Sequence, residues 1–188
     1  MLINTHQELS DVFKEVKSEI RRATVDKKHP FRFVVLSTCG NYVRSRYVVL
    51  RAVDQDFRLA IYTDSRSEKI EDLITDPMAQ LLFYHPKKQV QVLLTTEVEI
   101  HDKDELAKTH WKKVNGSAQK AYNSIDPPGT VVDNPTEGHR WKEQMDNEHF
   151  SVLILKPKEL EVLQLNRSEH LRASFNIYNN WKGEWLVP

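Results

Sequence analysis

Residues 62–69, YTDSRSEK, combine hydroxyl and cationic side chains at a point where a strand pattern ends and a helix pattern begins. They follow the alternating run FRLAIYT and precede the helical run KIEDLITDP. The start of a helix offers free N–H groups and a partial positive charge, which together favour anions. With Arg66 and Lys69 beside them, these groups predict a phosphate site.

The same segment also fits a purely structural role. Ser65 and Glu68 have the spacing of a capping box, and Ser67 could itself be the N-cap residue of the helix. A capped helix start needs no ligand, so this segment alone leaves both interpretations open.

Three arginines in the segment 43–53, VRSRYVVLRAV, are further candidates for binding an anion. Side chains alternate along a strand, so Arg44 and Arg46 are expected on one face and Arg51 on the other. Arg46 could reach a phosphate near residues 62–69 across a neighbouring strand. The alternative is an exposed strand face that carries charge for solvation only.

Metal and glycine-loop chemistry have little support in this sequence. The eight histidines are scattered and form no H-x-x-x-H pattern, so no metal site is predicted. The five glycines form neither a G-x-G-x-x-G nor a Walker loop, so side chains would have to hold any phosphate. Cys39 lies in the turn TCGNY with no evident base beside it, which indicates a structural role.

The composition excludes several function classes. The 27 Lys and Arg residues balance the 27 Asp and Glu residues, so no basic field favours nucleic acid. No apolar run approaches the ~20 residues of a membrane span, and the first residues lack the pattern of a secretory signal. A single cysteine forms no internal disulfide, which favours a reducing, cytoplasmic location.

Hydrophobic periodicity predicts the elements that position these residues. The spacing Thr5-x-x-Glu8 predicts a capping box, followed by an amphipathic helix that ends at about residues 22–24. Alternation then predicts five strands, with one short helix at 67–75 between the third and the fourth. These strands are 31–38, 43–53, 57–63, 78–85 and 89–101.

The second half of the chain adds helices, a long loop and further strands. Helices are predicted at 103–114 and 117–124, with a helical turn at 139–147, strands at 150–157 and 159–166, and a hairpin at 171–188. The loop 126–139 is rich in Pro and Gly, and its length is typical of a functional lid or a mobile segment. Together these patterns predict one domain, residues 1–188, that is mainly β: an antiparallel meander or barrel with peripheral helices.

Two tryptophans, Trp181 and Trp185, lie within the last eight residues. Such large side chains near a terminus indicate that the terminus is tied into a core or an interface.

Five segments in order resemble pyridoxamine 5'-phosphate oxidases and related FMN-binding split barrels. RYVVLR at 46–51 is similar to the family strand R-x-V-L-L-K, and YT with Ser and Lys in 62–69 is similar to its phosphate hinge. DPMAQLLFY at 76–84 and KQV at 88–90 resemble N-P-x-A-x-L-x-F-x-W and R-Q-V. The ending WKGEWLVP, 181–188, is similar to the family terminus W-x-x-x-R-L-x-P.

This resemblance implies an antiparallel Greek-key split barrel that forms a homodimer with two FMN molecules at the subunit interface. Carried over by position, Arg46, Ser67 and Lys69 would hold the FMN phosphate, with Arg66 beside them. The backbone would lie along the flavin at five positions, and one glutamine would face it. These residues are Val49, Leu50, Arg51, Tyr62, Thr63 and, for the glutamine, Gln89.

The sequence departs from the oxidase mainly at the substrate site. The oxidase has Lys in place of Arg51 and a phosphate-contacting Arg in place of Glu68. Its motif Y-x-x-x-R-x-x-x-S is not kept, because residues 111–115, WKKVN, lack the arginine. Its C-terminal R-x-H pair is replaced by His170-Leu-Arg172 in reversed order, which leaves Arg172 as a loosely matched catalytic candidate. The chain therefore resembles a related branch rather than the oxidase itself.

Two function classes follow. One is a flavoprotein oxidoreductase, in which FMN accepts a hydride from a small molecule, pyridoxamine 5'-phosphate or another substrate, and is reoxidised by oxygen or another acceptor. The other is a non-catalytic module that carries FMN, or another anionic ligand, as a sensor or store, which the missing substrate motif favours. A barrel without a ligand is a third possibility, and visible absorption of the purified protein separates it from the first two.

Overall fold

The computed structural model describes residues 1–166 and 169–188. The helices are α1 (Leu9–Val25), α2 (Glu68–Thr75) and α3 (Glu105–Trp111), with 3-10 turns η1 (Pro30–Arg32), η2 (Gly116–Tyr122) and η3 (Ile177–Asn179). The first four strands are β1 (Phe33–Cys39), β2 (Val43–Val53), β3 (Leu59–Asp64) and β4 (Met78–His85). The others are β5 (Val90–Asp102), β6 (Phe150–Gln164), β7 (Leu171–Asn176) and β8 (Gly183–Leu186). Within the described ranges, every helix is too short or too polar to cross a lipid bilayer.

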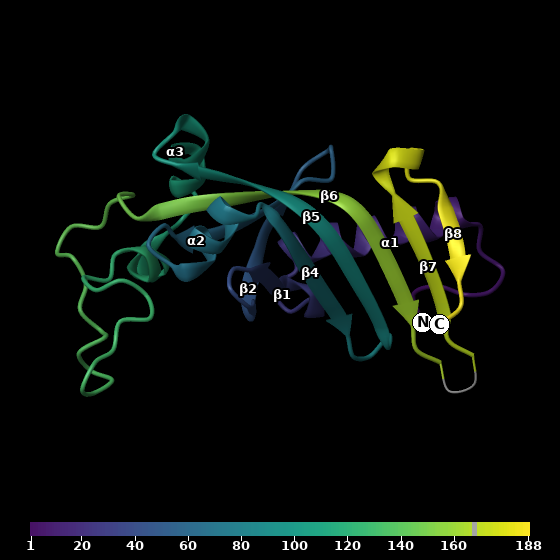
Figure 1. Ribbon diagram of the computed structural model, residues 1–188, viewed down its shortest axis with the longest axis horizontal. Helices are drawn as coiled ribbons and strands as arrows, with labels where there is room; N and C mark the ends of the chain where they lie inside the picture. The colour runs from purple at the N-terminus through teal and green to yellow at the C-terminus, as the bar shows by residue number, and fades with distance from the viewer. Residues whose placement is uncertain (167–168) are drawn as a thin grey trace.

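All strand pairs are antiparallel, and six of the strands close into a barrel. The strand order is β3-β2-β1-β4-β5-β6, and β3 also pairs with β6. The first four strands have the spatial order 4-1-2-3 of a Greek key, because β4 returns beside β1 through α2. The predicted Greek-key barrel is therefore confirmed. β7 and β8 extend the sheet beyond β6 and form a flap on one side of the molecule (Figure 1).

Alternation along the strands fills the barrel with apolar side chains. Inward residues of β1, β4 and β5 are almost completely buried, and α1 covers the barrel with its apolar stripe of Val12, Phe13, Val16 and Ile20. Each fully buried Leu, Ile, Val or Phe side chain contributes about 1.5–3 kcal/mol relative to an exposed one. The barrel is thus a packed core, so a ligand must bind at its mouth or on its outer surface.

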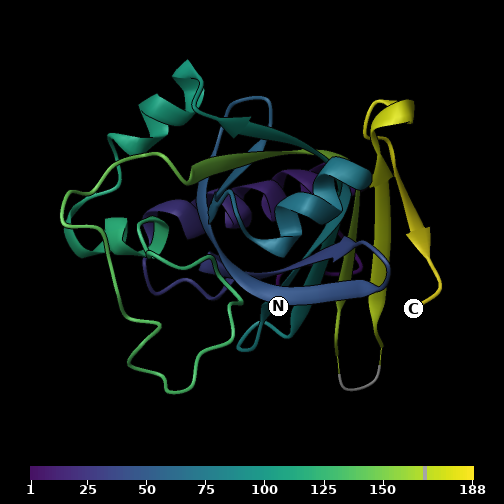
Figure 2. The same cartoon turned by 60° about the vertical axis from the view of Figure 1, so that its left-hand side comes forward.

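Two smaller elements flank this core. Helix α2 lies across one opening of the barrel, in front of the strands in Figure 2. A second apolar cluster lies outside the barrel, where α3 and η2 pack on the outer faces of β3 and β6. At its centre, the ring of Phe150 contacts Tyr62, Trp111 and Tyr122, with centroid distances of 5.0, 5.2 and 5.0 Å. The chain from residue 123 to 149 then leaves the barrel as a long loop (Figure 1).

Several predicted boundaries are wrong for local reasons. The Thr5 capping box does not form: α1 has Glu8 as N-cap without a side-chain bond, and Asn4 bonds to Gln7 instead. The Ser65 capping box is also absent, since Ser67 is the N-cap residue of α2, again without a side-chain cap bond. The segment 117–124 forms the 3-10 turn η2 rather than a helix, and 139–147 contains no helical turn.

The strands predicted at 150–157 and 159–166 are one continuous strand, β6. Pro157, which has no backbone N–H to donate, lies where the two predicted strands were divided. The register instead shifts at this point, where Thr96 pairs with Pro157 and Thr95 pairs with Glu159, so Lys158 is the extra residue of a bulge. The bulge absorbs the proline and lets β6 pair with both β5 and β3.

The C-terminal hairpin prediction is confirmed by β7 and β8, with Asn180 in the left-handed region at the turn. Trp181 stacks on Phe13 of α1 at a centroid distance of 5.1 Å, so this tryptophan does tie the terminus to the core. Trp185 is 43% exposed.

Candidate functional site

Polar and cationic side chains converge at the barrel mouth covered by α2. They come from the inner faces of β1, β2 and β3 and from the first turn of α2, so segments distant in sequence meet here. The central members are Thr38, Arg46, Thr63, Ser67 and Lys69. We call these five residues the cradle.

Lys69 is the most unusual cation of the cradle. Its Nζ donates to Thr63 Oγ1 and Ser67 Oγ, both at 2.9 Å. Within the part of the chain that the structure describes, no carboxylate lies within 4.0 Å of this ammonium group. Burial lowers the pKa of Lys69, and the nearby positive charge of Arg46 lowers it further. Among the described residues, the site therefore holds a partly buried cation that forms no ion pair within 4.0 Å.

Arg46 reaches the cradle from β2. Its Nη1 donates to Thr38 Oγ1 at 2.7 Å and to the Leu36 carbonyl at 3.4 Å. Arg44, on the same face, pairs with Asp72 of α2 at 2.6 Å, while Arg46 Nη2 is 3.9 Å from that carboxylate. The two arginines thus share a face, as expected from strand alternation.

Glu68, which takes the place of an arginine in the family motif, is exposed and pairs with Arg44. Its carboxylate lies 3.6 Å from Arg44 Nε and its side chain is 66% exposed. Solvent and Arg44 therefore screen its charge, and the repulsion of a phosphate by Glu68 is weakened.

Arg66 ties the helix start to the long loop. Its guanidinium bonds to both oxygens of the buried Asp64, at 3.0 and 2.7 Å. It also donates to the carbonyl oxygens of Ser124 and Ile125, at 3.0 and 3.1 Å. These contacts anchor residues 124–125 beside the cradle and occupy most of the donors that a phosphate would use.

Arg51 projects from the opposite face of β2, again as expected. Its guanidinium lies 5.3 Å from the centroid of the Tyr62 ring, and its Nε is buried without a hydrogen-bond partner among the described residues. The register of β2 against β3 shifts between Leu50 and Ala52, so Arg51 lies in a bulge. Such a bulge leaves backbone groups unpaired next to Val49 and Leu50. No local pattern in the sequence indicates this bulge.

Tyr62 is fixed from its other side by α3. Its hydroxyl bonds to His110 Nδ1 at 2.9 Å. Burial raises the pKa of the Tyr62 phenol and lowers the pKa of the His110 imidazole, so both groups are neutral near pH 7.

Gln89 and Arg172 lie away from the cradle of their own chain. Gln89 occupies the turn between β4 and β5, with φ 50°, whereas Thr38 pairs with Ala79 at the opposite end of β4. These two ends are six strand residues apart, which corresponds to a distance of roughly 20 Å along β4. Arg172 is on β7, outside the closed barrel, where it pairs with Glu161 at 2.8 Å.

A buried polar cluster, which the sequence analysis missed, lies near this far end. Glu19 of α1 accepts from His29 Nε2 at 2.9 Å and from Lys88 Nζ at 2.7 Å, and His85 Nε2 is 4.0 Å away. Burial alone would raise the pKa of the Glu19 carboxyl, but the bonds from Lys88 and His29 outweigh it and lower the pKa.

Glu19, His29 and His85 are close enough together to suggest a metal site. However, each histidine accepts a backbone N–H at Nδ1, from Phe31 and Lys88 respectively. The proton of each neutral ring is therefore on Nε2, the atom that would have to bind the metal. The cluster is better described as a structural link between α1 and the β4–β5 turn.

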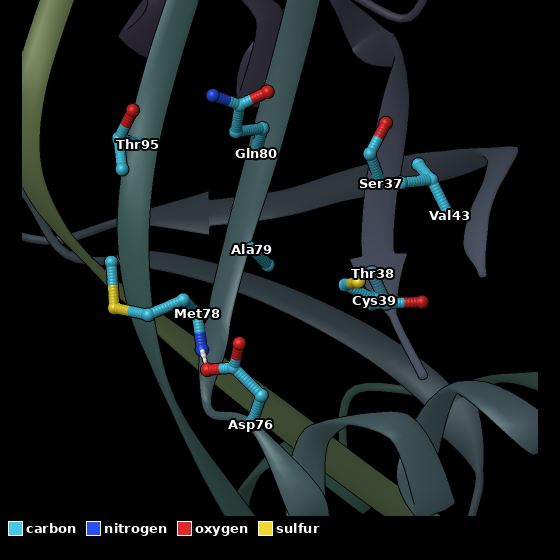
Figure 3. A pocket seen from close by; sticks show the side chains of 9 residues that line it. All are labelled: Ser37, Thr38, Cys39, Val43, Asp76, Met78, Ala79, Gln80 and Thr95. Atoms are coloured by element: carbon cyan, nitrogen blue, oxygen red, sulfur yellow. Dashed lines mark hydrogen bonds between the residues drawn. The ribbon is translucent and has the colours of Figure 1, made fainter. Parts of the chain in front are cut away.

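A shallow groove of about 250 Å³ lies on the outer surface of the sheet (Figure 3). Thr38 of the cradle also lines this groove, but none of its described lining residues is cationic, so the groove is not an anion site. Its walls come from β1, β2, β4 and β5 and include Ser37, Cys39, Val43, Met78, Gln80 and Thr95.

Comparison with known proteins identifies the fold and finds a family model that matches part of the chain. Residues 12–102 match the family model described as pyridoxamine 5'-phosphate oxidase, FMN-binding domain. A search of curated protein sequences found no match.

Solved structures with the same fold cover nearly the whole chain. A pyridoxamine 5'-phosphate oxidase-related, FMN binding protein from Nostoc punctiforme PCC 73102 is similar with a TM-score of 0.78 and 17% identity, over 94% of this chain and 97% of that one. PhzG from Burkholderia lata 383, in complex with tetrahydrophenazine-1-carboxylic acid, has a TM-score of 0.77 and 18% identity, over 100% and 99%. General Stress Protein 26 from Bacillus anthracis str. Sterne has a TM-score of 0.53 and 18% identity, over 84% and 98%.

Proposed function

Because residues 12–102 match the FMN-binding domain of the pyridoxamine 5'-phosphate oxidase family, and the barrel has the fold of its related FMN-binding proteins, we propose that this chain binds FMN and acts as a flavin-dependent oxidoreductase. The observation that carries this proposal is the state of Lys69. A partly buried ammonium group beside a second cation, bonded to hydroxyls alone among the described residues, is a donor set suited to a phosphate dianion.

Arg46, Ser67 and Lys69 would hold the FMN phosphate. Arg66 would flank it and keep the loop at residues 124–125 beside the bound cofactor. The backbone of the β2 bulge and of β3 would lie along the flavin, through Val49, Leu50, Arg51, Tyr62 and Thr63. When bound, FMN supplies hydride acceptance from a substrate and reoxidation by oxygen or another acceptor.

A homodimer would complete this site. Gln89 and the weaker catalytic candidate Arg172 lie too far from the cradle of their own chain to contact a flavin bound there. A second copy of the chain would therefore contribute them. The outer faces of β1, β2 and β4 expose a set of large apolar side chains that a partner could bury. These are Phe33, Val43, Tyr47, Met78 and Tyr84, which are 39–74% exposed.

The substrate side differs from a phosphate-binding site. Trp111 packs on Phe150 and Tyr122 in the second apolar cluster, and Asn115 stands where the oxidase's substrate-phosphate motif has its arginine. This observation disfavours pyridoxamine 5'-phosphate as substrate. It also supports a second candidate function, an FMN-binding module without turnover.

The first test is the visible absorption of the purified protein and identification of any chromophore released on denaturation. A yellow protein that releases FMN supports the proposal. The double variant R46A/K69A should lose the flavin, whereas a control that removes two exposed cations, R58A/K108A, should keep it. A colourless protein that fails to take up added FMN refutes it.

Turnover separates the two candidates. The FMN-loaded protein is mixed anaerobically with NADH, NADPH or pyridoxamine 5'-phosphate, and bleaching of the flavin absorbance is followed. Reduction by any of these within seconds to minutes favours the oxidoreductase. A flavin that stays oxidised with every donor favours the module.

A further inference from the structure

A buried chain of hydrogen bonds lies behind the cradle. Arg46 Nη1 donates to Thr38 Oγ1 at 2.7 Å, and Thr38 Oγ1 donates to Asp72 Oδ2 at 2.7 Å. Thr38 and Asp72 are only 2% and 4% exposed. The chain therefore joins β2, β1 and α2, and its Thr38–Asp72 bond is buried.

The direction of these bonds is fixed by chemistry. Arg46 has only donors, so the Thr38 oxygen must accept from it. The single hydroxyl hydrogen of Thr38 then goes to Asp72, the only acceptor that the structure shows for it among the described residues. The carboxylate thus orients the hydroxyl, and the hydroxyl orients the guanidinium.

Arg44 completes the arrangement by neutralising Asp72. Its Nη1 lies 2.6 Å from Oδ1, so the carboxylate charge is matched without Arg46. Gly40 is required for this pair, since a Cβ at that position would lie 2.3 Å from Asp72 Oδ1 and 3.0 Å from Arg44 Nη1. Arg46, with Nη2 at 3.9 Å from Asp72, keeps its charge available for an anion.

We propose that Thr38 and Asp72 are positioning residues that hold Arg46 against the phosphate, and that they set the preference of this protein for FMN over riboflavin. This inference rests on the proposed FMN site. The two ligands share the isoalloxazine ring and the ribityl chain and differ only by the phosphate. A loss of Arg46 orientation therefore weakens FMN binding and leaves riboflavin binding unchanged.

The test measures the dissociation constants of FMN and riboflavin for the apoprotein by quenching of flavin fluorescence. Thr38→Val removes the hydroxyl with little change in volume, and we expect it to weaken FMN binding about tenfold at constant riboflavin affinity. Thr38→Ser keeps the hydroxyl and should retain the wild-type preference. Thr38→Cys replaces it with a weak hydrogen-bonding thiol and serves if the valine variant does not fold.

Thr96→Val is the matched control. Thr96 is fully buried on β5 and donates to the Ala79 carbonyl at 3.0 Å, outside the chain that leads to Arg46. It should lower stability without changing the ratio of the two dissociation constants.

The possible outcomes distinguish a failure of the positioning role of Thr38 from a failure of the proposed phosphate site. A wild-type preference for FMN that survives in the Thr38→Val or Thr38→Cys variant overturns the positioning role alone. An equal weakening of both ligands also overturns it, because Thr38 would then act only on the fold. A wild-type protein with no preference for FMN overturns the proposed phosphate site and the positioning role together, and this result is visible before any variant is made.

Discussion

Replacing Lys69 by methionine tests the proposed phosphate site in two opposite directions. The change keeps the length of the side chain and removes its charge. In the FMN complex it removes one charge-assisted hydrogen bond to the phosphate, worth about 1.5–3 kcal/mol. FMN affinity should therefore fall by about 10- to 150-fold.

The apoprotein should respond in the opposite way. Because Lys69 is partly buried and has no carboxylate within 4.0 Å among the described residues, burial of its charge opposes folding. Methionine relieves that cost, offset in part by the lost bonds to the Thr63 and Ser67 hydroxyls. We expect the free energy of unfolding to rise by about 1 kcal/mol. This is the low end of the gain from replacing buried charges by apolar groups, because the Lys69 ammonium is partly exposed.

The predicted loss of FMN affinity and the predicted gain of apoprotein stability are measured by different assays on the same variant. Fluorescence titration gives the FMN affinity, and urea unfolding of the apoprotein gives its stability. Lys108→Met, which removes an exposed lysine paired with Glu105, is the control and should change neither. A Lys69→Met apoprotein destabilised by more than 1 kcal/mol, with FMN affinity within threefold of wild type, would show that Lys69 is a structural residue and refute the reasoning.

Three further results are expected. Glu19→Gln should destabilise the protein by about 3 kcal/mol in urea unfolding, since it leaves Lys88 without its buried partner. Because folding lowers the pKa of Glu19, its carboxylate adds stability above the ordinary pKa near 4.5, and this stability is lost as the pH falls through the pKa of the folded state. The variant lacks this carboxylate, so its stability should fall less steeply at acid pH; an unchanged acid limb of the stability–pH curve would contradict that. Gly40→Ala should weaken FMN binding about tenfold and leave riboflavin binding unchanged, because the added Cβ displaces Asp72; a variant that keeps the wild-type affinity for FMN would contradict this. Tyr47→Glu should convert the proposed dimer to monomers in sedimentation velocity, and a dimer that persists would move the interface elsewhere.

The sequence by itself determined most of the elements. Period-2 alternation located β2 and β4 at the residues where they are found, and the helix pattern located α2 to within one residue. These patterns are local, because they depend only on which side chains must face a core. The face of β2 that carries Arg44 and Arg46, opposite to that of Arg51, followed from the same alternation.

Only the tertiary structure decided how the site is assembled. The bonds of Arg66 to residues 124–125 of the loop, the link from Arg46 through Thr38 to Asp72, and the bulge at Arg51 depend on closure of β3 against β6 and on the position of α2. Such contacts join residues that are distant in sequence, and no local pattern records which partner each one finds. The sequence shows that a strand carries a cationic side chain. Whether that side chain meets a carboxylate, a hydroxyl or no counter-ion depends on tertiary packing, which therefore sets its pKa and its capacity to bind an anion.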